Sequence, residues 1–433
     1  MDKTDAPQHS QTMIDTLILG GGLAGTAAAL WLADLGHGST IVEARPRLGG
    51  RAHACPWGDA GLEVDYGGGW IRTDHAEMIG LAKRLDITLI PRAPIIQHSH
   101  FRDGMWHADP AEDMAAHDAG LTQLLADAKI MADDTPASRA LHAMTLQDYL
   151  THRALPPSVV REVLAWWSIS GSAPPDQVGV NEYLTPKLAK GLLIKLEELA
   201  FTVQGGASII PQAAARASGS DVVLGDAVER LEDRGDCVQA TLASGRKITA
   251  RTALVALPVN TLSQIRFTPP LTPAQSRLRK LGHQGAAIKL MIRAKGPSPG
   301  HLATGEALGL RWIYADRHLP DGSTLLVAFG LHREVGEPTF AMVQTTMAAA
   351  FPSAEVLDFD WHDWINDPFA RGTWVSPTLA TLPDYGPQHW AMQGRIAFAG
   401  SDLYSAEQGW FEGALLTART AVAALDLCLK QNG

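Results

Sequence analysis

The sequence predicts an α/β protein of two domains, the first of which is assembled from separated segments around a parallel sheet. Three observations predict this class. The chain has 433 residues, which exceeds the size at which single hydrophobic cores usually stop growing. Residues 14–43 have the pattern of a strand, a glycine turn, a helix and a second strand, which is one βαβ unit. Short apolar runs in 221–258 and 394–402 are typical of further strands of the same sheet.

The first predicted element is a strand over Ile14–Leu19, whose apolar run is typical of a strand buried on both faces. The Ala- and Leu-rich residues 23–35 predict a helix that stops at Gly36. A second strand is expected over 39–43.

Gly20, Gly22 and Gly25 form a G-x-G-x-x-G motif between the first strand and the helix. Glu43 follows Gly25 at close to the spacing of roughly 20 residues expected for a carboxylate that binds ribose hydroxyls. Glycine at these positions permits a tight turn and lets a pyrophosphate approach the backbone. The motif in this context predicts a Rossmann-like dinucleotide-binding unit, but the glycines alone do not distinguish NAD from FAD.

A second domain with a mixed sheet and helices, of α+β type, is predicted for the remaining segments. Helical periodicity occurs in 159–168 and 188–200, and strand-like runs lie between 286 and 331. We therefore expect a discontinuous nucleotide domain from 1–85, 205–285 and 376–433, and a substrate-binding domain from 86–204 and 286–375.

Composition excludes several function classes. The net charge of −10, without a cluster of Lys and Arg, argues against nucleic-acid binding. The three cysteines are far apart and lack CxxC spacing, which favours free thiols. The histidines show no metal-ligand spacing, so we expect no metal. Residues 1–12 are polar, and no run reaches roughly 18 apolar residues, so we expect a soluble cytoplasmic protein without a membrane partner.

Two further stretches narrow the class of protein. Arg47, Gly49, Gly50 and Arg51 form an R-x-G-G-R motif soon after Glu43. Residues 64–70 read VDYGGGW, and 397–422 read AFAGSDLYSAEQGWFEGALLTARTAV. In these motifs the chain resembles the flavin amine oxidase superfamily, which includes monoamine oxidases, polyamine oxidases and L-amino acid oxidases.

The resemblance implies that FAD is the dinucleotide. Thr373 stands where members with covalent flavin carry a Cys, so noncovalent FAD is implied. The final helix, expected from about Gly409, would direct its positive end toward the flavin. The implied cofactor-binding residues are Gly20, Gly22, Leu23, Ala24, Gly25, Glu43, Ala44, Arg45, Gly50, Arg51, Gly67, Gly68, Gly69, Trp70, Val228, Gly400, Ser401, Asp402, Gly409, Trp410 and Phe411.

The resemblance also implies three catalytic residues. Lys289 stands where many members keep a lysine that holds a water at flavin N5; the alternative is a surface lysine on an edge strand. Trp374 and Trp410 resemble the paired aromatics that form a cage in front of the flavin and suit an amine nitrogen. The alternative for both is core packing.

The function implied is an FAD-dependent oxidase of a small, aromatic or cyclic, primary or secondary amine. Hydride transfer from the α-carbon to flavin N5 would give an imine, which water hydrolyses to an aldehyde or ketone, and O2 would yield H2O2. An L-amino acid oxidase stays open because Arg72 could bind a carboxylate.

A dehydrogenase with a protein electron acceptor also stays open, as does a homodimer. Lys289 together with Trp410 argues against a porphyrinogen-type oxidase or desaturase, and against a flavoprotein without turnover.

Overall fold

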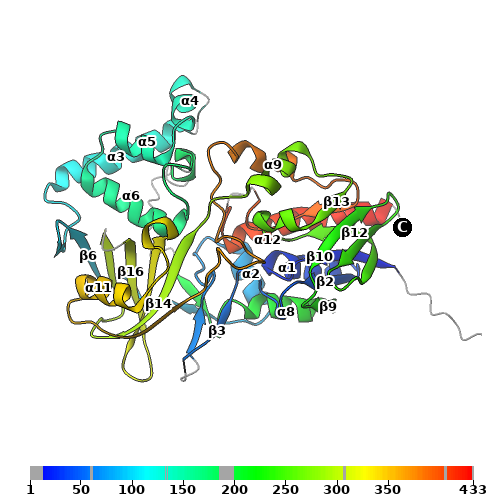
Figure 1. Cartoon of the computed structure of the whole chain (residues 1–433), viewed down its shortest axis with the longest axis horizontal. Helices are drawn as coiled ribbons and strands as arrows, with labels where there is room; N and C mark the ends of the chain where they lie inside the picture. Colours follow the sequence, from blue (N-terminus) through cyan, green and yellow to red (C-terminus); the bar gives the residue numbers. More distant parts are fainter. Residues whose placement is uncertain are drawn as a thin grey trace, which may run out of the picture.

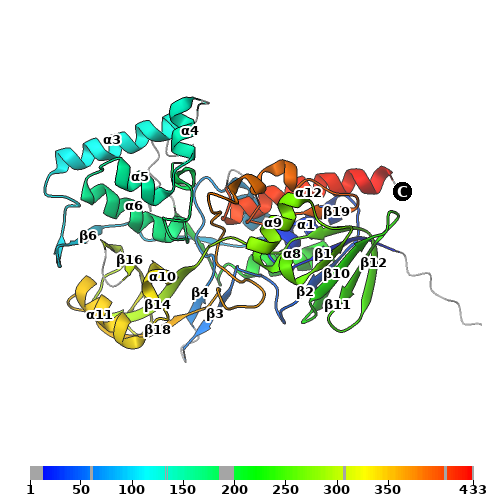
Figure 2. The same ribbon diagram turned by 45° about the horizontal axis from the view of Figure 1, so that its top comes forward.

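The chain folds into two lobes that meet along one side of each (Figures 1 and 2). This computed structural model describes residues 13–58, 62–131, 133, 135–184, 199–305, 309–403 and 407–431. Each lobe is built on one large sheet with helices packed against it.

The first sheet has the strand order β13-β10-β11-β12-β1-β2-β9, and β19 also pairs with β12. β1 lies between β12 and β2 and is parallel to both. Its strands are β1 (Ile14–Leu19), β2 (Ser39–Glu43), β9 (Asp221–Leu224), β10 (Val228–Asp233), β11 (Val238–Leu242), β12 (Lys247–Val255), β13 (Arg266–Thr268) and β19 (Ile396–Phe398).

Four helices pack together on one face of this sheet, in a core rich in alanine and leucine. They are α1 (Leu23–Asp34), α2 (Ala76–Arg84), α8 (Ile209–Ser218) and α12 (Phe411–Gln431). A second core lies on the opposite face and includes residues of α9 (Pro273–Leu281) and of the 3-10 segments Val259–Gln264 and Leu382–Tyr385.

The second sheet has the order β18-β14-β17-β16-β15-β6-β7 and is mixed, because β6 runs parallel to β15. One face is covered by α11, with Ile288 and Leu290 in the shared core. The strands and this helix are β6 (Gln97–Arg102), β7 (Met105–His107), β14 (Ala287–Lys295), β15 (His301–Gly305), β16 (Leu310–His318), β17 (Thr324–Leu331), β18 (Glu355–Trp361) and α11 (Phe340–Ala350).

A helical group stands over the second sheet at its other face (Figure 2). It comprises α3 (Met114–Met131), α4 (Pro136–His142), α5 (Leu146–His152) and α6 (Pro157–Ser170), with the 3-10 turn Val180–Glu182. The remaining elements are β3 (Ala54–Trp57) paired with β4 (Leu62–Asp65), β5 (Leu89–Pro91) paired with β8 (Phe201–Val203), α10 (His332–Val335) and the turn Pro387–His389.

The predicted fold class is confirmed. The βαβ unit, the strands of 221–258 and the strand runs between 286 and 331 are present. The helix expected over 188–200 falls mostly on 188–198, which lie outside the described residues. Strands of the first sheet come only from the three segments assigned to the nucleotide domain, and strands of the second only from the other two. The domain boundaries themselves stay a prediction.

Two smaller findings concern the cysteines and the search for membrane-spanning helices. Cys55 and Cys237 are free thiols. Within the described parts of the chain, none of the helices combines the length and apolar character that a bilayer span requires.

Gly25 sets how closely α1 approaches β1. A Cβ at this position would lie 2.1 Å from the carbonyl oxygen of Gly20 and 3.1 Å from Cγ2 of Ile18. Gly80, inside α2, has no atom within 4 Å of the equivalent point. The two helical glycines therefore differ in the space available to a side chain.

We predict that Gly25→Ala lowers the free energy of unfolding by about 2 kcal/mol or more, because the helix must shift to relieve the clash. Gly80→Ala should leave it unchanged or raise it by about 0.5–1 kcal/mol, because alanine has less backbone entropy to lose. Chemical denaturation of both variants measures this. Equal effects would contradict the packing role of Gly25.

Candidate active site

One large cavity runs between the two lobes. It encloses about 1890 Å³ of space between atoms, a volume that includes solvent at its open mouth. Its wall combines the loops after β1 and β2, the start of α12 and one face of β14 and β17.

The sequence-predicted residues gather at this cavity. All three predicted catalytic residues line it, as do all but two of the predicted cofactor-binding residues. The exceptions are Gly25, which packs behind Gly20, and Asp402, which is 1% exposed and contacts Arg51 from behind.

Glu43 organises one end of the cavity. One carboxylate oxygen accepts from the Gly21 backbone N–H at 2.8 Å, and the other accepts from the Arg45 N–H at 2.8 Å. Because a carboxylate can accept about four hydrogen bonds, Glu43 keeps acceptor capacity for a hydroxylated ligand. Nearby, Gly22 and Gly50 approach so closely that a Cβ on Gly50 would lie 3.2 Å from the Gly22 Cα.

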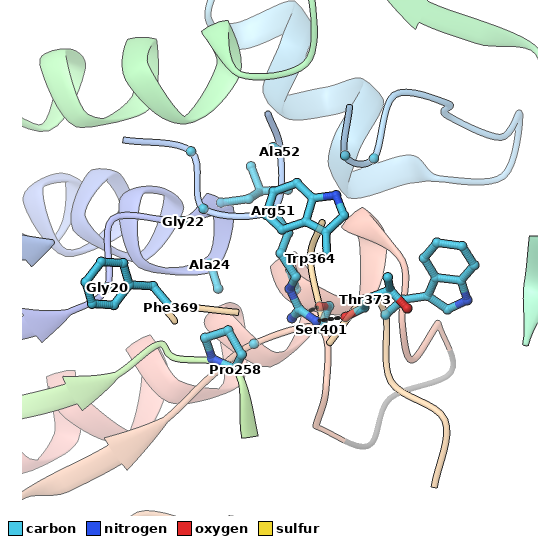
Figure 3. Close-up of a pocket in the computed structure, with 18 of the residues that line it drawn as sticks. Gly20, Gly22, Ala24, Arg51, Ala52, Pro258, Trp364, Phe369, Thr373 and Ser401 are labelled. Carbon is cyan, nitrogen blue, oxygen red and sulfur yellow. Dashed lines mark hydrogen bonds between the residues drawn. The ribbon is translucent and has the colours of Figure 1, made fainter. Parts of the chain in front are cut away.

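Arg51 crosses the middle of the cavity wall (Figure 3). It donates to the carbonyl of Thr373 at 2.5 Å and to Oγ of Ser401 at 3.0 Å, and it pairs with Asp402 at 2.6 Å. Burial acts to raise the pKa of Asp402, but Arg51 and then His283 bring it below its ordinary value. Asp402 therefore stays ionised and fixes a cation that borders the cavity.

Lys289 lies at the other end, on the inner strand β14 rather than on an edge strand. Its Nζ donates to the carbonyls of Asp65 at 2.5 Å and Gly67 at 2.8 Å. Burial lowers its pKa to about 8, although Asp65 acts in the opposite direction. The lysine can therefore change protonation state near neutral pH, and it has one N–H left for the cavity.

Residues 67–69 pass this end of the cavity as a glycine strip. A Cβ on Gly67 would lie 1.8 Å from the Arg51 carbonyl oxygen, and one on Gly68 would lie 2.6 Å from the Phe411 ring. Only glycine fits, so the backbone forms the wall here. The first turn of α12, which begins at Phe411, lines the same region.

Trp374 and Trp410 both line this end, and each contacts a second aromatic ring. Trp374 packs edge-on against Phe329, with ring centres 6.3 Å apart. Trp410 packs against His75 at 5.6 Å, and the guanidinium of Arg72 lies 5.6 Å from its ring centre. Their indoles therefore belong to the cavity wall and not to a closed core.

Arg72 does not line the cavity. Its side chain is 2% exposed, donates to Asp74 at 2.6 Å and to Glu407 at 3.4 Å, and lies behind Trp410. Two carboxylates already balance its charge, so this arrangement does not offer a guanidinium to a substrate carboxylate.

Sequence reasoning missed part of the wall near Lys289 and Trp374. These residues come from the end of α6, from the segment before β8, from the start of β14 and from β17, and they carry no motif, because they are ordinary apolar or small side chains. They are Ile169, Ser170, Leu199, Ala287 and Phe329. Trp364 and Phe369, from the loop after β18, were also missed (Figure 3).

Nothing in the described chain forms a group of three His, Cys, Asp or Glu side chains that could hold a metal ion. No cysteine or histidine is among the described residues that line the cavity.

Taken together, the Rossmann-like sheet, the glycine-lined cavity and the lysine beside an aromatic chamber define a class of dinucleotide-dependent oxidoreductase. The chain belongs to the flavin-containing amine oxidoreductase family, whose model matches residues 23–426. It is therefore a flavin-dependent enzyme that acts on amines.

Individual relatives and solved structures agree with this family. The chain is 30% identical to (S)-6-hydroxynicotine oxidase of Paenarthrobacter nicotinovorans, over 95% of this chain and 99% of the relative. It is 24% identical to pseudooxynicotine dehydrogenase of a Pseudomonas species, over 95% and 86%. The structure of cyclohexylamine oxidase from Brevibacterium oxydans superposes with a TM-score of 0.83 at 23% identity, over 97% and 100% of the two chains.

We predict that Glu43→Gln raises the dissociation constant for FAD about tenfold, because the amide keeps one acceptor oxygen and sets its NH2 against a backbone donor. Titration of the apoprotein with FAD, followed by flavin fluorescence, measures the change. Glu63→Gln, on exposed β4, is the control and should bind FAD as the wild type does. An unchanged constant in Glu43→Gln would remove Glu43 from the cofactor site.

Proposed function

We propose that this protein is an oxidase of small aromatic or cyclic primary or secondary amines that uses noncovalently bound FAD. The observation that carries the proposal is the chamber around Lys289, which is walled by indole and phenyl rings and has no carboxylate among its described lining residues. Among the described lining residues, Glu43 is the one acidic side chain, and it lies at the nucleotide end.

The cavity fits FAD in its chemistry. Glu43 would bind the ribose, the glycine turn and Arg51 would face the pyrophosphate, and Gly67, Gly68 and Gly69 would leave room for the ring system. Thr373 lines the wall, and none of the described lining residues is a cysteine or a histidine. This supports noncovalent binding. When bound, FAD supplies the hydride acceptor for the amine α-carbon and passes the electrons to O2, which yields the imine and H2O2.

The protein residues position the amine and exclude water. Trp374, Trp410 and Phe329 offer flat apolar surfaces to a ring-containing substrate. Because the described chamber lacks a carboxylate, it favours the neutral amine, whose nitrogen lone pair is free to assist loss of hydride. The same absence disfavours diamines, whose second ammonium would need a buried counter-charge.

The relative named (S)-6-hydroxynicotine oxidase supports a ring-containing substrate. The solved structures of putrescine oxidase and cyclohexylamine oxidase are each under 25% identical and support the fold alone. The L-amino acid oxidase alternative loses the support of Arg72, which is buried behind Trp410 between two carboxylates. One relative named an L-amino acid dehydrogenase still supports it. A protein electron acceptor in place of O2 stays an alternative, since several relatives are named dehydrogenases.

Anaerobic mixing with benzylamine, cyclohexylamine and phenylalanine tests the substrate class. We expect the two amines to bleach the flavin absorbance and the amino acid to leave it unchanged, because Arg72, the residue that could bind a carboxylate, does not line the chamber. Admission of air should restore the absorbance and release H2O2. Bleaching by phenylalanine alone would overturn the proposal in favour of the amino acid oxidase.

We further expect Lys289→Met to slow reoxidation of the reduced flavin by O2 about tenfold or more while FAD stays bound, because a cation that balances developing negative charge is lost. Lys295→Met is the matched control, since Lys295 ends the same strand, is 58% exposed and pairs with Glu355. Stopped-flow absorbance measures both rates. Equal rates in the wild type and in Lys289→Met would remove Lys289 from the mechanism.

The pKa of about 8 also predicts a pH dependence. The lysine is protonated below that pH and loses its charge above it, so the wild-type reoxidation rate should fall as the pH rises through about 8. The measurement contains no amine, so substrate ionisation does not contribute. Lys289→Met should show no such fall; a fall retained in that variant would assign it to another group.

A further inference from the structure

Arg92 lies behind the chamber wall and contacts it at two places. The residue follows β5, and its side chain is 5% exposed. Its backbone N–H donates to Ala200 at 2.8 Å, and its guanidinium donates to the carbonyl of Leu199 at 2.9 Å. Leu199 lines the cavity. Arg92 thus holds the backbone of one wall residue directly.

The guanidinium also packs on aromatic rings. It lies 4.1 Å from the ring centre of Trp70 and 4.7 Å from that of Tyr314. Trp70 lines the chamber, and its ring is also 5.7 Å from Nζ of Lys289. Arg92 therefore backs a second wall residue, which itself borders the predicted catalytic lysine.

The charge of Arg92 is expensive to bury in this environment. Its ionic partner is Asp316, at 3.6 Å, and Asp316 is shared with Arg317, which approaches to 2.8 Å. Nε and one terminal nitrogen of Arg92 are buried without a hydrogen-bond partner. A buried cation with unsatisfied donors does not favour stability, so its contacts with the chamber wall point to a role there.

We propose that Arg92 is a positioning residue for substrate selection, which holds Trp70 and Leu199 in place and so fixes the width of the amine chamber. This inference rests on the proposed function. A planar guanidinium can lie flat on an indole while its edge donates to a carbonyl, whereas an ammonium lacks the flat surface and an apolar side chain lacks the donor. Loss of Arg92 would remove the guanidinium from the Trp70 ring, which would keep its contacts with Trp312 and Phe329 but could yield to a wider substrate.

The test compares two amines of different width, benzylamine and 1-naphthylmethylamine, on the holoenzyme. We expect Arg92→Met to lower the ratio of kcat/KM for benzylamine to that for 1-naphthylmethylamine at least about threefold, in line with the size of a stacked cation–aromatic contact. The change should come mainly from KM. Arg92→Lys, which keeps the charge but not the planar group, should lower the ratio by less, and it is the variant measured if Arg92→Met does not fold.

Arg317→Met is the matched control. Arg317 shares Asp316 but is 46% exposed and directs its other donor to the carbonyl of Glu63. The Arg317→Met variant should lose an ion pair with Asp316 without a change in the ratio of the two kcat/KM values. An unchanged ratio in the Arg92 variants, or an equal change in Arg317→Met, would overturn the positioning role. If the wild type oxidises neither amine, the proposed function fails instead, so the two failures are distinguishable.

Discussion

The close approach of the glycine strip 67–69 to its neighbours is the constraint on which the rest of the site depends. A side chain on Gly67 would collide with the Arg51 carbonyl on one side, and its own carbonyl accepts from Lys289 of the second sheet on the other. The strip therefore joins the loops of the first lobe to β14 of the second. Because backbone forms the wall here, the cavity continues from Glu43 to the aromatic chamber without interruption by side chains.

Charged side chains are distributed unevenly along this cavity, so its two ends suit different chemical groups. Arg51 and Arg45 border the nucleotide part, each paired with a buried aspartate, Asp402 or Asp367. In the chamber, Lys289 is the one charged side chain among the described lining residues, and burial brings its pKa to about 8. A phosphate finds fixed cations at one end, and an uncharged amine finds aromatic surfaces at the other.

Much of this site was predictable from sequence, because its cofactor part is made by motifs with a physical reason for each residue. The glycine turn, Glu43 and Arg51 each serve local backbone or charge requirements that leave a spacing pattern. The chamber wall was not predictable in the same way: Ile169, Leu199 and Phe329 come from distant elements and are ordinary core residue types. Arg72 illustrates the same limit of prediction from sequence, since the sequence could not reveal that Asp74 and Glu407 already balance its charge.

The central claim is that one cavity orients the cofactor with its nucleotide end at Glu43 and its reactive ring at Lys289. A crystal structure of the FAD-bound protein, soaked with a non-oxidisable amine, tests this most directly. We predict electron density for the adenosine ribose within hydrogen-bond distance of Glu43, with the ring system beside residues 67–69 and the amine between Trp374 and Trp410. A ring system placed away from Lys289, or an amine bound outside the two indoles, would contradict the account.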